Sequence, residues 1–310
     1  MGQEKMKTIL ETKRLFLREM DSKDYDALSL VLVDSDNMKH YPYTFDEKRV
    51  KSWIDRNMQR YREDGFGLWA VCLKETGELI GDCGLTLQMI HGEILPEIGY
   101  HIRACFQRIG YAKEAAKAVR DWAFRNTDYP ALYSYCKNTN LPSIRTAEAI
   151  GMHFDCEYPD EANGITHVSS IHRDDLMRNM IDWAESMLGC KDYANWNFSF
   201  MKDAFEISND SKLFTGDSVQ ESCRLYQDAL QSGMPEKGAF VFYDFLRLIG
   251  CRPVNWGHCG ISLGDGKIIH AWDEVRIDDY RQVESFYDAS GDHPVYIGWV
   301  PFSRVLRQKP

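Results

Sequence analysis

The chain of 310 residues is predicted to be an α+β protein with two domains. Residues 96–123 combine a strand pattern, in which Ile98, Tyr100 and Ile102 alternate with polar residues, and the apolar stripe of a helix. A separate series of helix and strand patterns begins near residue 190. Because the length suits about two domains, the two series are interpreted as one domain each.

Capping and turn residues delimit the elements of the first domain. Asp21 is a favourable helix cap, Gly77 suits a turn that needs a positive φ, and Gly151 ends a helix. A central strand that leads into a crossover helix predicts a mixed, twisted sheet with flanking helices. The expected strands are 14–19, 68–73, 79–87, 98–102, 131–136 and a hairpin over 152–171, and the expected helices are 21–32, 47–63, one that includes 115–123, and 142–150.

Residues 1–172 are predicted to form the first domain, 173–189 a linker helix and 190–310 the second domain. The linker is placed there because a helical pattern ends at Gly189 before the new series begins. In the second domain the expected helices are 198–207 and 219–232, and the expected strands are 239–243, 258–263, 267–271 and 296–301.

Composition and charge narrow the class of protein. The net charge of −10 argues against a nucleic-acid surface, which normally needs a basic patch. The chain has no run of about 18 apolar residues, and its first residues lack the apolar core of a secretory signal. The nine cysteines form no CxxC pair, so neither a zinc site nor a disulfide framework is expected. We expect a cytoplasmic protein with no metal and no nucleic-acid or membrane partner, and its oligomeric state stays open.

The segment 107–112, QRIGYA, has the features of a phosphate site. Gly110 and Ala112 have little or no side chain, so a ligand can approach the backbone closely. The helix that follows offers unpaired N–H groups and the positive end of its dipole. Such a site suggests a cofactor that contains a pyrophosphate. Arg108 and Lys113 either add charge towards the phosphates or are ordinary surface cations.

The same loop carries a family resemblance. Gln107, Gly110 and Ala112 match the Gln/Arg-x-x-Gly-x-Gly/Ala loop of the GNAT acetyltransferases, which the chain resembles over about residues 8–172. Three further segments are similar to the GNAT branch that acetylates ribosomal-protein N-termini: 12–19, 97–100 and 140–152. The resemblance implies a GNAT fold, acetyl-CoA as co-substrate, and direct transfer of the acetyl group to a primary amine in a ternary complex.

The resemblance also implies roles for single residues. Glu97 is either the general base or a solvent-facing strand residue, and His101 on the same strand face is a second candidate base. Ser143 is the implied acid for the leaving thiolate, although Asn140 and Ser143 are equally suited to cap a helix. Many GNAT enzymes have a tyrosine acid in that helix, and residues 145–150 contain none. The residues implied to bind the cofactor are Ile102, Arg103, Gln107, Arg108, Ile109, Gly110, Tyr111, Ala112 and Asn140.

Two histidines dominate the second domain. His258 and His270 are separated by a glycine-containing turn, so they come from adjacent strands. Together with segment 235–243, this pattern resembles the NlpC-type cysteine peptidases and amidases, which have a papain-like α+β fold, over about residues 190–305. The resemblance implies that His258 is the general base and that His270 orients it. Asn197 stands where the family has its nucleophilic cysteine, which implies a degenerate hydrolase site.

Two functions follow from these patterns. The favoured one is an acetyl-CoA-dependent N-acetyltransferase for a small-molecule or peptide amine, with a second domain that binds without hydrolysing. The alternative is a cell-wall-peptide hydrolase or peptide-binding protein whose first domain is a CoA-binding sensor. Hydrolysis would require another nucleophile. Cys190 needs a shifted alignment, and Cys259 points away from His258 because neighbouring strand residues face opposite sides.

Overall fold

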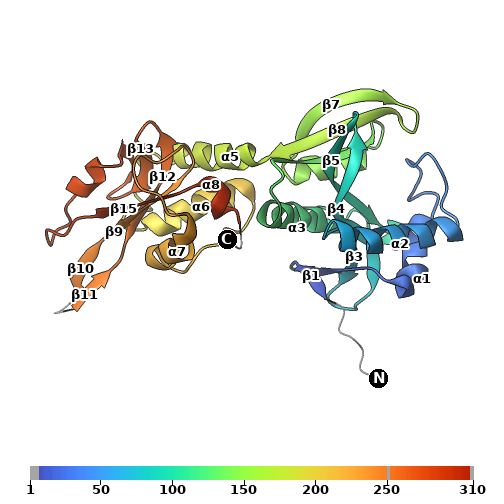
Figure 1. Ribbon diagram of the computed structural model, residues 1–310, viewed down its shortest axis with the longest axis horizontal. Coiled ribbons are helices and arrows are strands. Elements are labelled where there is room, and N and C mark those ends of the chain that lie inside the picture. Colours follow the sequence, from blue (N-terminus) through green and yellow to red (C-terminus); the bar gives the residue numbers. More distant parts are fainter. Residues whose placement is uncertain (1–6, 250–251, 308–310) are drawn as a thin grey trace, which may run out of the picture. The chain divides into compact units, whose positions relative to one another are not determined.

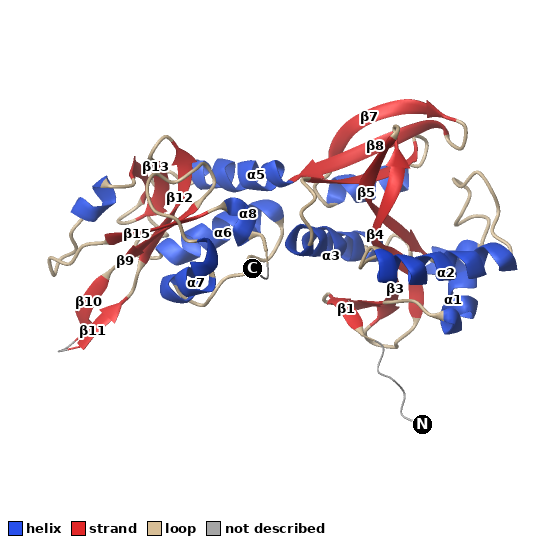
Figure 2. Ribbon diagram, in the orientation of Figure 1, coloured by secondary structure: helices blue, strands red, loops and turns tan. Residues whose placement is uncertain are grey.

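The computed structural model describes residues 7–249 and 252–307 (Figure 1). Contacts between residues divide the chain into two compact units, Met1–His172 (unit 1) and Arg173–Pro310 (unit 2). Both units combine strands with helices, as Figure 2 shows. Among the described residues, no helix combines the length and the apolar character needed to cross a membrane.

Unit 1 is built on a sheet of eight strands in the order β1-β2-β3-β4-β5-β6-β8-β7. Neighbouring strands run antiparallel, except for the parallel pair β5 and β6. All the expected strands form, and β1 is additional to them. The strands are β1 (Thr8–Glu11), β2 (Leu15–Arg18), β3 (Leu68–Leu73), β4 (Leu79–Ile90), β5 (Glu93–Ile102), β6 (Ala131–Lys137), β7 (His153–Asp160) and β8 (Gly164–His172).

Helices cover both faces of this sheet. Apolar residues of α1 and α2 form one core cluster with Leu68, Ala70 and Cys72 of β3. On the other face, α3 connects β5 to β6 and packs against β4 and β5, with the Trp122 and Trp69 rings 4.9 Å apart. The expected helices are confirmed, α2 with the predicted bounds. The helices are α1 (Tyr25–Leu32), α2 (Glu47–Glu63), α3 (Tyr111–Asn126) and α4 (Leu141–Ala149), with 3-10 turns at Ser22–Asp24 and Ala104–Phe106.

Unit 2 has an antiparallel sheet in the order β14-β13-β12-β9-β15, and a separate hairpin of β10 and β11. Helix α6 packs against β12 and β13, and α5 packs against α6. The segment predicted as a linker therefore contributes α5 to unit 2. The elements are α5 (Arg173–Ser186), α6 (Asn197–Asn209), α7 (Val219–Leu225), β9 (Phe240–Asp244), β10 (Leu246–Ile249), β11 (Arg252–Asn255), β12 (His258–Gly264), β13 (Lys267–Ala271), β14 (Val275–Asp279), β15 (Val295–Val300) and α8 (Phe302–Val305), with 3-10 turns at Gln227–Ala229 and Gln282–Ser285.

The prediction of one helix over 219–232 was wrong, because α7 ends at Leu225. Arg304 explains the early end. Its guanidinium donates to the Leu225 carbonyl (3.2 Å) and forms an ion pair with Asp228 (2.8 Å). Tyr226, which follows Leu225, is fully buried. These tertiary contacts replace the next helical turn, which local sequence patterns alone do not reveal.

Candidate active site

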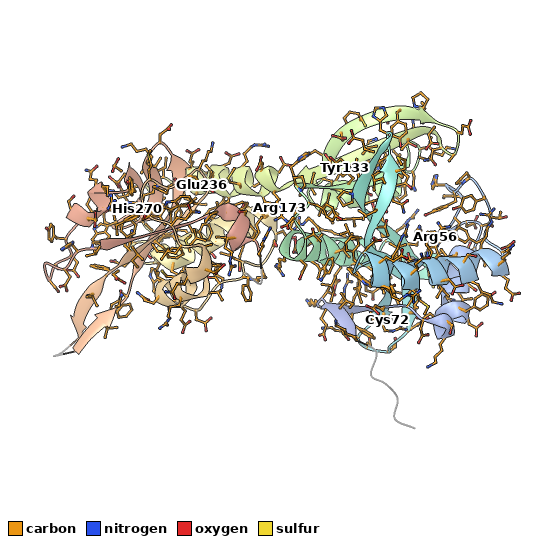
Figure 3. The ribbon with its side chains drawn as sticks, in the orientation of Figure 1. Arg56, Cys72, Tyr133, Arg173, Glu236 and His270 are labelled. Carbon is orange, nitrogen blue, oxygen red and sulfur yellow. The ribbon has the colours of Figure 1, made fainter. Side chains whose placement is uncertain are left out.

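The centre of unit 1 is the point where β5 and β6 separate. Within the described chain these two strands share one register pair, Glu97 of β5 with Tyr133 of β6. Figure 3 labels Tyr133. The Arg103 N–H donates to the Ile80 carbonyl (2.8 Å) on the β4 side. Because backbone groups of a strand point alternately to its two neighbours, the N–H groups of Tyr100 and Ile102 point to the open side. Ile102 and Arg103 were both predicted to bind the cofactor, and of these two only Ile102 offers its N–H on the open side.

The loop after β5 presents backbone N–H groups at the start of α3. Gly110 caps the helix with φ of 89°, a left-handed conformation that favours glycine, and Arg108 also has a positive φ of 62°. The first N–H bonded within the helix is that of Glu114, which donates to the Gly110 carbonyl (3.0 Å). The preceding N–H groups, those of Tyr111, Ala112 and Lys113, have no partner within the helix. An anion is thus favoured at this end of α3.

A brace from the turn between β1 and β2 holds this loop, and the sequence patterns did not reveal it. The Arg14 Nε forms an ion pair with Glu114 Oε2 (2.6 Å), and Arg14 Nη1 donates to the Ile109 carbonyl (3.1 Å). Glu114 Oε1 also accepts from Thr12 Oγ1 (2.6 Å). Burial raises the pKa of Glu114, but the hydrogen bonds from Thr12 and Arg14 outweigh it and lower the pKa overall. The 100 residues that separate Arg14 from Glu114 explain why local patterns missed the contact.

The side chain of Gln107, a predicted cofactor residue, bonds back to the end of β5. Its Nε2 donates to the Ile102 carbonyl (2.8 Å) and to Asn37 Oδ1. The Gln107 N–H also donates to the Ala104 carbonyl (3.1 Å). Gln107 therefore shapes the loop through these contacts, although it is exposed like Arg108 and Ile109.

Glu97 lies on the face of β5 towards α2, directly opposite Thr86 of β4. The Thr86 hydroxyl donates to Glu97 Oε2 (2.7 Å). A Cβ added at Gly99 would stand 3.2 Å from both carboxylate oxygens of Glu97, so the glycine leaves room for this carboxylate. Burial raises the pKa of Glu97. The hydrogen bond from Thr86 and the positive charges of His101 and Arg60 offset part of this increase. A carboxyl group with a raised pKa suits proton transfer.

The same face carries a chain of three hydrogen bonds around His101. Its Nδ1 lies 2.6 Å from Asp82 Oδ1, and its Nε2 lies 2.6 Å from the Tyr41 hydroxyl. The Trp53 Nε1 donates to the second oxygen of Asp82 (2.8 Å). Asp82 is fully buried, whereas 13% of the His101 side chain is accessible. The sequence patterns indicated His101 but neither Asp82 nor Tyr41, because cross-strand and loop contacts depend on the fold.

Ser143 and Asn140 lie on the opposite face, at the start of α4. Asn140 is the helix cap and accepts from the Ser143 N–H (3.4 Å), as the structural interpretation of the pair predicts. The Tyr100 hydroxyl lies 3.2 Å from Ser143 Oγ and donates to the Ser143 carbonyl (2.8 Å). A tyrosine hydroxyl is thus present beside Ser143, although it comes from β5 and not from the helix where many GNAT enzymes have theirs.

Comparison with known proteins agrees with this geometry. The model of the acetyltransferase (GNAT) domain matches residues 14–153. The uncharacterised Bacillus subtilis protein YkkB is 36% identical over 149 residues, which are 48% of this chain and 87% of YkkB. The chain belongs to the GNAT acetyltransferase family. Unit 1 therefore has the GNAT fold, with a mixed sheet and flanking helices, and the protein is an acetyl-CoA-dependent N-acetyltransferase.

Two further relatives show how much of the chain the likeness covers. The uncharacterised N-acetyltransferase YnaD of Bacillus subtilis is 32% identical over 144 residues, which are 46% of this chain and 81% of YnaD. A crystal structure of an acetyltransferase from Agrobacterium tumefaciens is 29% identical, covers 55% of this chain and 99% of its own, and has a TM-score of 0.46.

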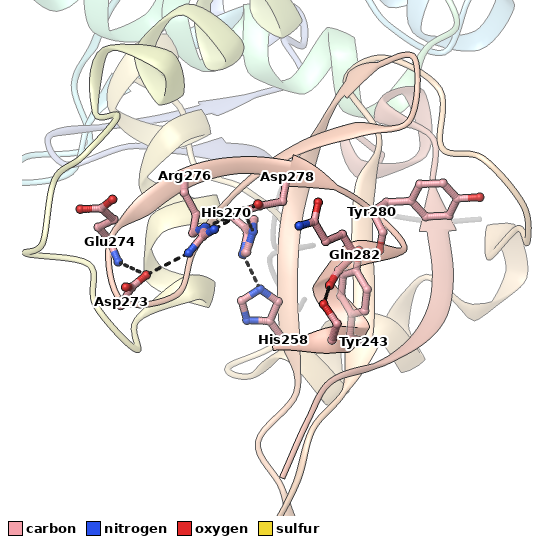
Figure 4. A network of polar contacts seen from close by, with 10 residues as sticks. Tyr243, His258, His270, Asp273, Glu274, Arg276, Asp278, Tyr280 and Gln282 are labelled. Carbon is pink, nitrogen blue, oxygen red and sulfur yellow. Dashed lines mark hydrogen bonds and ion pairs between the residues drawn. The ribbon is translucent and has the colours of Figure 1, made fainter. Parts of the chain in front are cut away.

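Unit 2 of this GNAT protein contains a second polar cluster (Figure 4). The His258 Nε2 and His270 Nδ1 atoms lie 2.8 Å apart, and His270 Nε2 lies 3.1 Å from Asp278 Oδ2. Arg276 Nε donates to the same Asp278 oxygen (2.6 Å). Burial lowers the pKa of both histidines. Burial raises the pKa of Asp278, but the hydrogen bonds from His270 and Arg276 outweigh it and bring the value to about 2.

Asn197 does not join the histidines. Its Oδ1 accepts from Cys259 Sγ (3.3 Å), and Cys259 faces α6. His258 pairs with Tyr243 of β9 and faces the other side of the sheet, because consecutive strand residues alternate. The structure thus brings two of the three predicted hydrolase residues together, and no group of three or more potential metal ligands occurs in the described part of the chain.

The buried histidines make the stability of unit 2 depend on pH. In the unfolded chain histidine has a pKa of about 6.5, whereas the fold lowers the pKa of His258 and keeps it neutral at lower pH. The contribution of the two histidines to the free energy of unfolding is therefore fully present above about pH 6.5. It falls as the pH drops below this value, by roughly 1.4 kcal/mol per pH unit for each histidine that stays neutral. Hydrogen exchange of β12 and β13 at pH 8 and pH 5, corrected for intrinsic rates, measures this loss. His258→Gln is expected to flatten the slope, and an unchanged slope would refute the assignment to this pair.

Proposed function

We propose that the protein acetylates a primary amine of a small molecule or peptide by direct transfer from acetyl-CoA in a ternary complex, with residues 1–172 as the catalytic domain. The observation that carries the proposal is that β5 pairs with β6 only at Glu97, and that β5 continues past this pair to the loop that ends at Gly110. This arrangement offers one path for the cofactor and a carboxylate beside it.

The cofactor contacts follow from the backbone. The N–H groups of the segment 108–112 receive the pyrophosphate, since the helix N-terminus and the glycine favour close approach of an anion. The pantetheine arm lies along the open side of β5, where Ile102 offers its N–H. Asn140 at the start of α4 contacts the arm from the other side. The N–H groups on this edge polarise the thioester carbonyl in the manner of an oxyanion hole.

Two side chains then move protons. Glu97 takes a proton from the amine, which must be neutral before its nitrogen attacks the thioester carbonyl. The carbon–sulfur bond breaks, and Ser143, in contact with the Tyr100 hydroxyl, gives a proton to the leaving thiolate and takes one back from solvent. Both roles are supported by position, since Glu97 and Ser143 come from opposite sides of the sheet at the same opening.

A direct assay tests the proposal. Purified protein is incubated with acetyl-CoA and one of three amines, namely spermidine, tyramine or a hexapeptide with a free N-terminal serine, and released thiol is measured. Acetylation of an amine with a matching release of thiol is expected. Failure to bind acetyl-CoA in a calorimetric titration would overturn the proposal.

We further propose that unit 2 is an accessory binding domain of NlpC type that does not hydrolyse peptides. The support is that Asn197, at the expected nucleophile position, contacts Cys259 and lies across the sheet from His258. Burial raises the pKa of the Cys259 thiol, which opposes its use as a nucleophile. A fluorogenic cell-wall peptide should therefore not be cleaved, and cleavage that disappears in His258→Ala would contradict this proposal.

A further inference from the structure

The hydrogen-bond chain Trp53–Asp82–His101–Tyr41 lies on the face of the sheet that also carries Glu97. Asp82 and His101 are direct cross-strand partners, as are Thr86 and Glu97, and the glycine pair Gly84 and Gly99 separates the two. Both oxygens of Asp82 have a partner, and both ring nitrogens of His101 have one. Such complete pairing fixes the ring orientation of His101.

The partners of His101 determine its protonation state. An ionised Asp82 accepts from the Nδ1–H of His101, which leaves the lone pair on Nε2 facing the Tyr41 hydroxyl. Burial lowers the pKa of His101, but the charges of Asp82 and Glu97 outweigh it and raise the pKa overall. Burial raises the pKa of Tyr41, so its hydroxyl keeps its proton and donates it to Nε2. The positive charge of Arg60 on α2 also acts on this face, where it lowers the pKa of Glu97.

The reaction removes two protons from a cationic amine, and Glu97 alone accepts one. A cationic amine loses one proton before attack and a second when its nitrogen bonds to the acetyl carbon. One proton returns to the thiolate, and the other leaves the site. A second proton acceptor near Glu97 is therefore useful, and the His101 chain is the buried polar system on the same face.

We propose that Tyr41, His101 and Asp82 form a proton relay for the acceptor amine. The Tyr41 hydroxyl takes the second proton from the nitrogen while its own proton passes to His101 Nε2. The N–H bond of the amine breaks, a new O–H bond forms on Tyr41, and His101 becomes an imidazolium paired with the Asp82 carboxylate. His101 later releases this proton to solvent, which restores the relay.

The three residues have different roles, and the relay rests on the proposed acetyl transfer. Tyr41 is the group that touches the amine, whereas His101 and Asp82 act through it as positioning residues. Tyr41 belongs to the segment between α1 and α2, and its ring contacts Tyr43, Phe45 and His101 with centroids 5.4–5.9 Å apart. These ring contacts hold Tyr41 beside His101, on the face of the sheet that carries Glu97.

Kinetics of three conservative variants test the relay. Tyr41→Phe, His101→Gln and Asp82→Asn are expected to lower kcat at least about tenfold for the amine that the wild type acetylates. Each should shift the acidic limb of the kcat–pH profile and leave the Kd for acetyl-CoA unchanged. Tyr43→Phe, which removes a neighbouring hydroxyl outside the chain, is the matched control with wild-type kcat. Wild-type kcat and pH profile in all three variants would overturn the relay while leaving acetyl transfer intact.

A second measurement needs no acceptor. The imidazole of His101 is titrated by NMR in the full chain with CoA bound. The wild type is expected to titrate above ordinary histidine with Nδ1 protonated, and Asp82→Asn should move the midpoint downwards. A midpoint that is the same in both proteins, or a neutral ring protonated on Nε2, would overturn the relay. If the wild type does not bind CoA, the proposed function is refuted instead.

Discussion

Replacing Gly110 with tryptophan is expected to abolish measurable binding of acetyl-CoA. Gly110 has φ of 89°, where a side chain is strained, at a cost of about 1–3 kcal/mol. The new indole would also occupy the space in which the pyrophosphate approaches the N–H groups of α3. The strain alone corresponds to roughly a 5- to 150-fold weaker Kd if the loop must change to relieve it. Calorimetric titration with acetyl-CoA measures the effect.

A matched substitution separates loss of the site from general strain. Gly92 has φ of 86° in the turn between β4 and β5, and an added Cβ there meets nothing within 4 Å. Gly92→Trp should therefore bind acetyl-CoA with the wild-type Kd. If Gly110→Trp binds acetyl-CoA as tightly as the wild type, the phosphate site lies elsewhere.

The second large effect is expected for Glu97→Gln, which should lower kcat by about 10²–10⁴-fold with little change in acetyl-CoA affinity. The amide keeps the shape of the side chain and its contact with Thr86 but cannot take a proton. Because burial raises the pKa of Glu97, activity of the wild type should fall with acidification at a higher pH than an exposed glutamate would give. This limb of the kcat–pH profile should shift in the variant, because Glu97 no longer contributes to it.

Glu93 provides the control for this change. It lies on the same strand as Glu97, it is exposed, and it faces the same side because four positions separate the two. Glu93→Gln is expected to keep the wild-type kcat. Equal kcat values for Glu97→Gln and the wild type would exclude Glu97 as the group that takes the proton.

Local patterns predicted much of unit 1, because its elements have clear boundaries in the sequence. The strand at Ile98–Ile102 and the glycine loop were recognised from periodicity and from Gly110, and α3 begins at Tyr111, directly after that glycine. The brace between Arg14 and Glu114 was not predicted, since a pair 100 residues apart leaves no periodic trace. The same reason applies to Asp82, which becomes a partner of His101 only through the pairing of β4 with β5.

In unit 2 the sequence placed His258 and His270 on adjacent strands, and β12 and β13 confirm this pairing. The features that were missed include β14 and the early end of α7. Both depend on partners from elsewhere in the chain. Strand β14 pairs with β13, and its Asp278 bonds to His270. Arg304 donates a hydrogen bond to the Leu225 carbonyl at the end of α7.

The sequence by itself determined the family, the reaction class and the loop around Gly110, because backbone conformation and helix capping depend on residues close in the chain. Only the tertiary structure decided which side chains meet. In the tertiary structure the Arg103 N–H bonds to β4, and His101 bonds to both Asp82 and Tyr41. Asn197 lies across the sheet from His258. Strand register and the side of a sheet on which a residue falls are settled by long-range pairing, where a shift of one residue reverses every side chain.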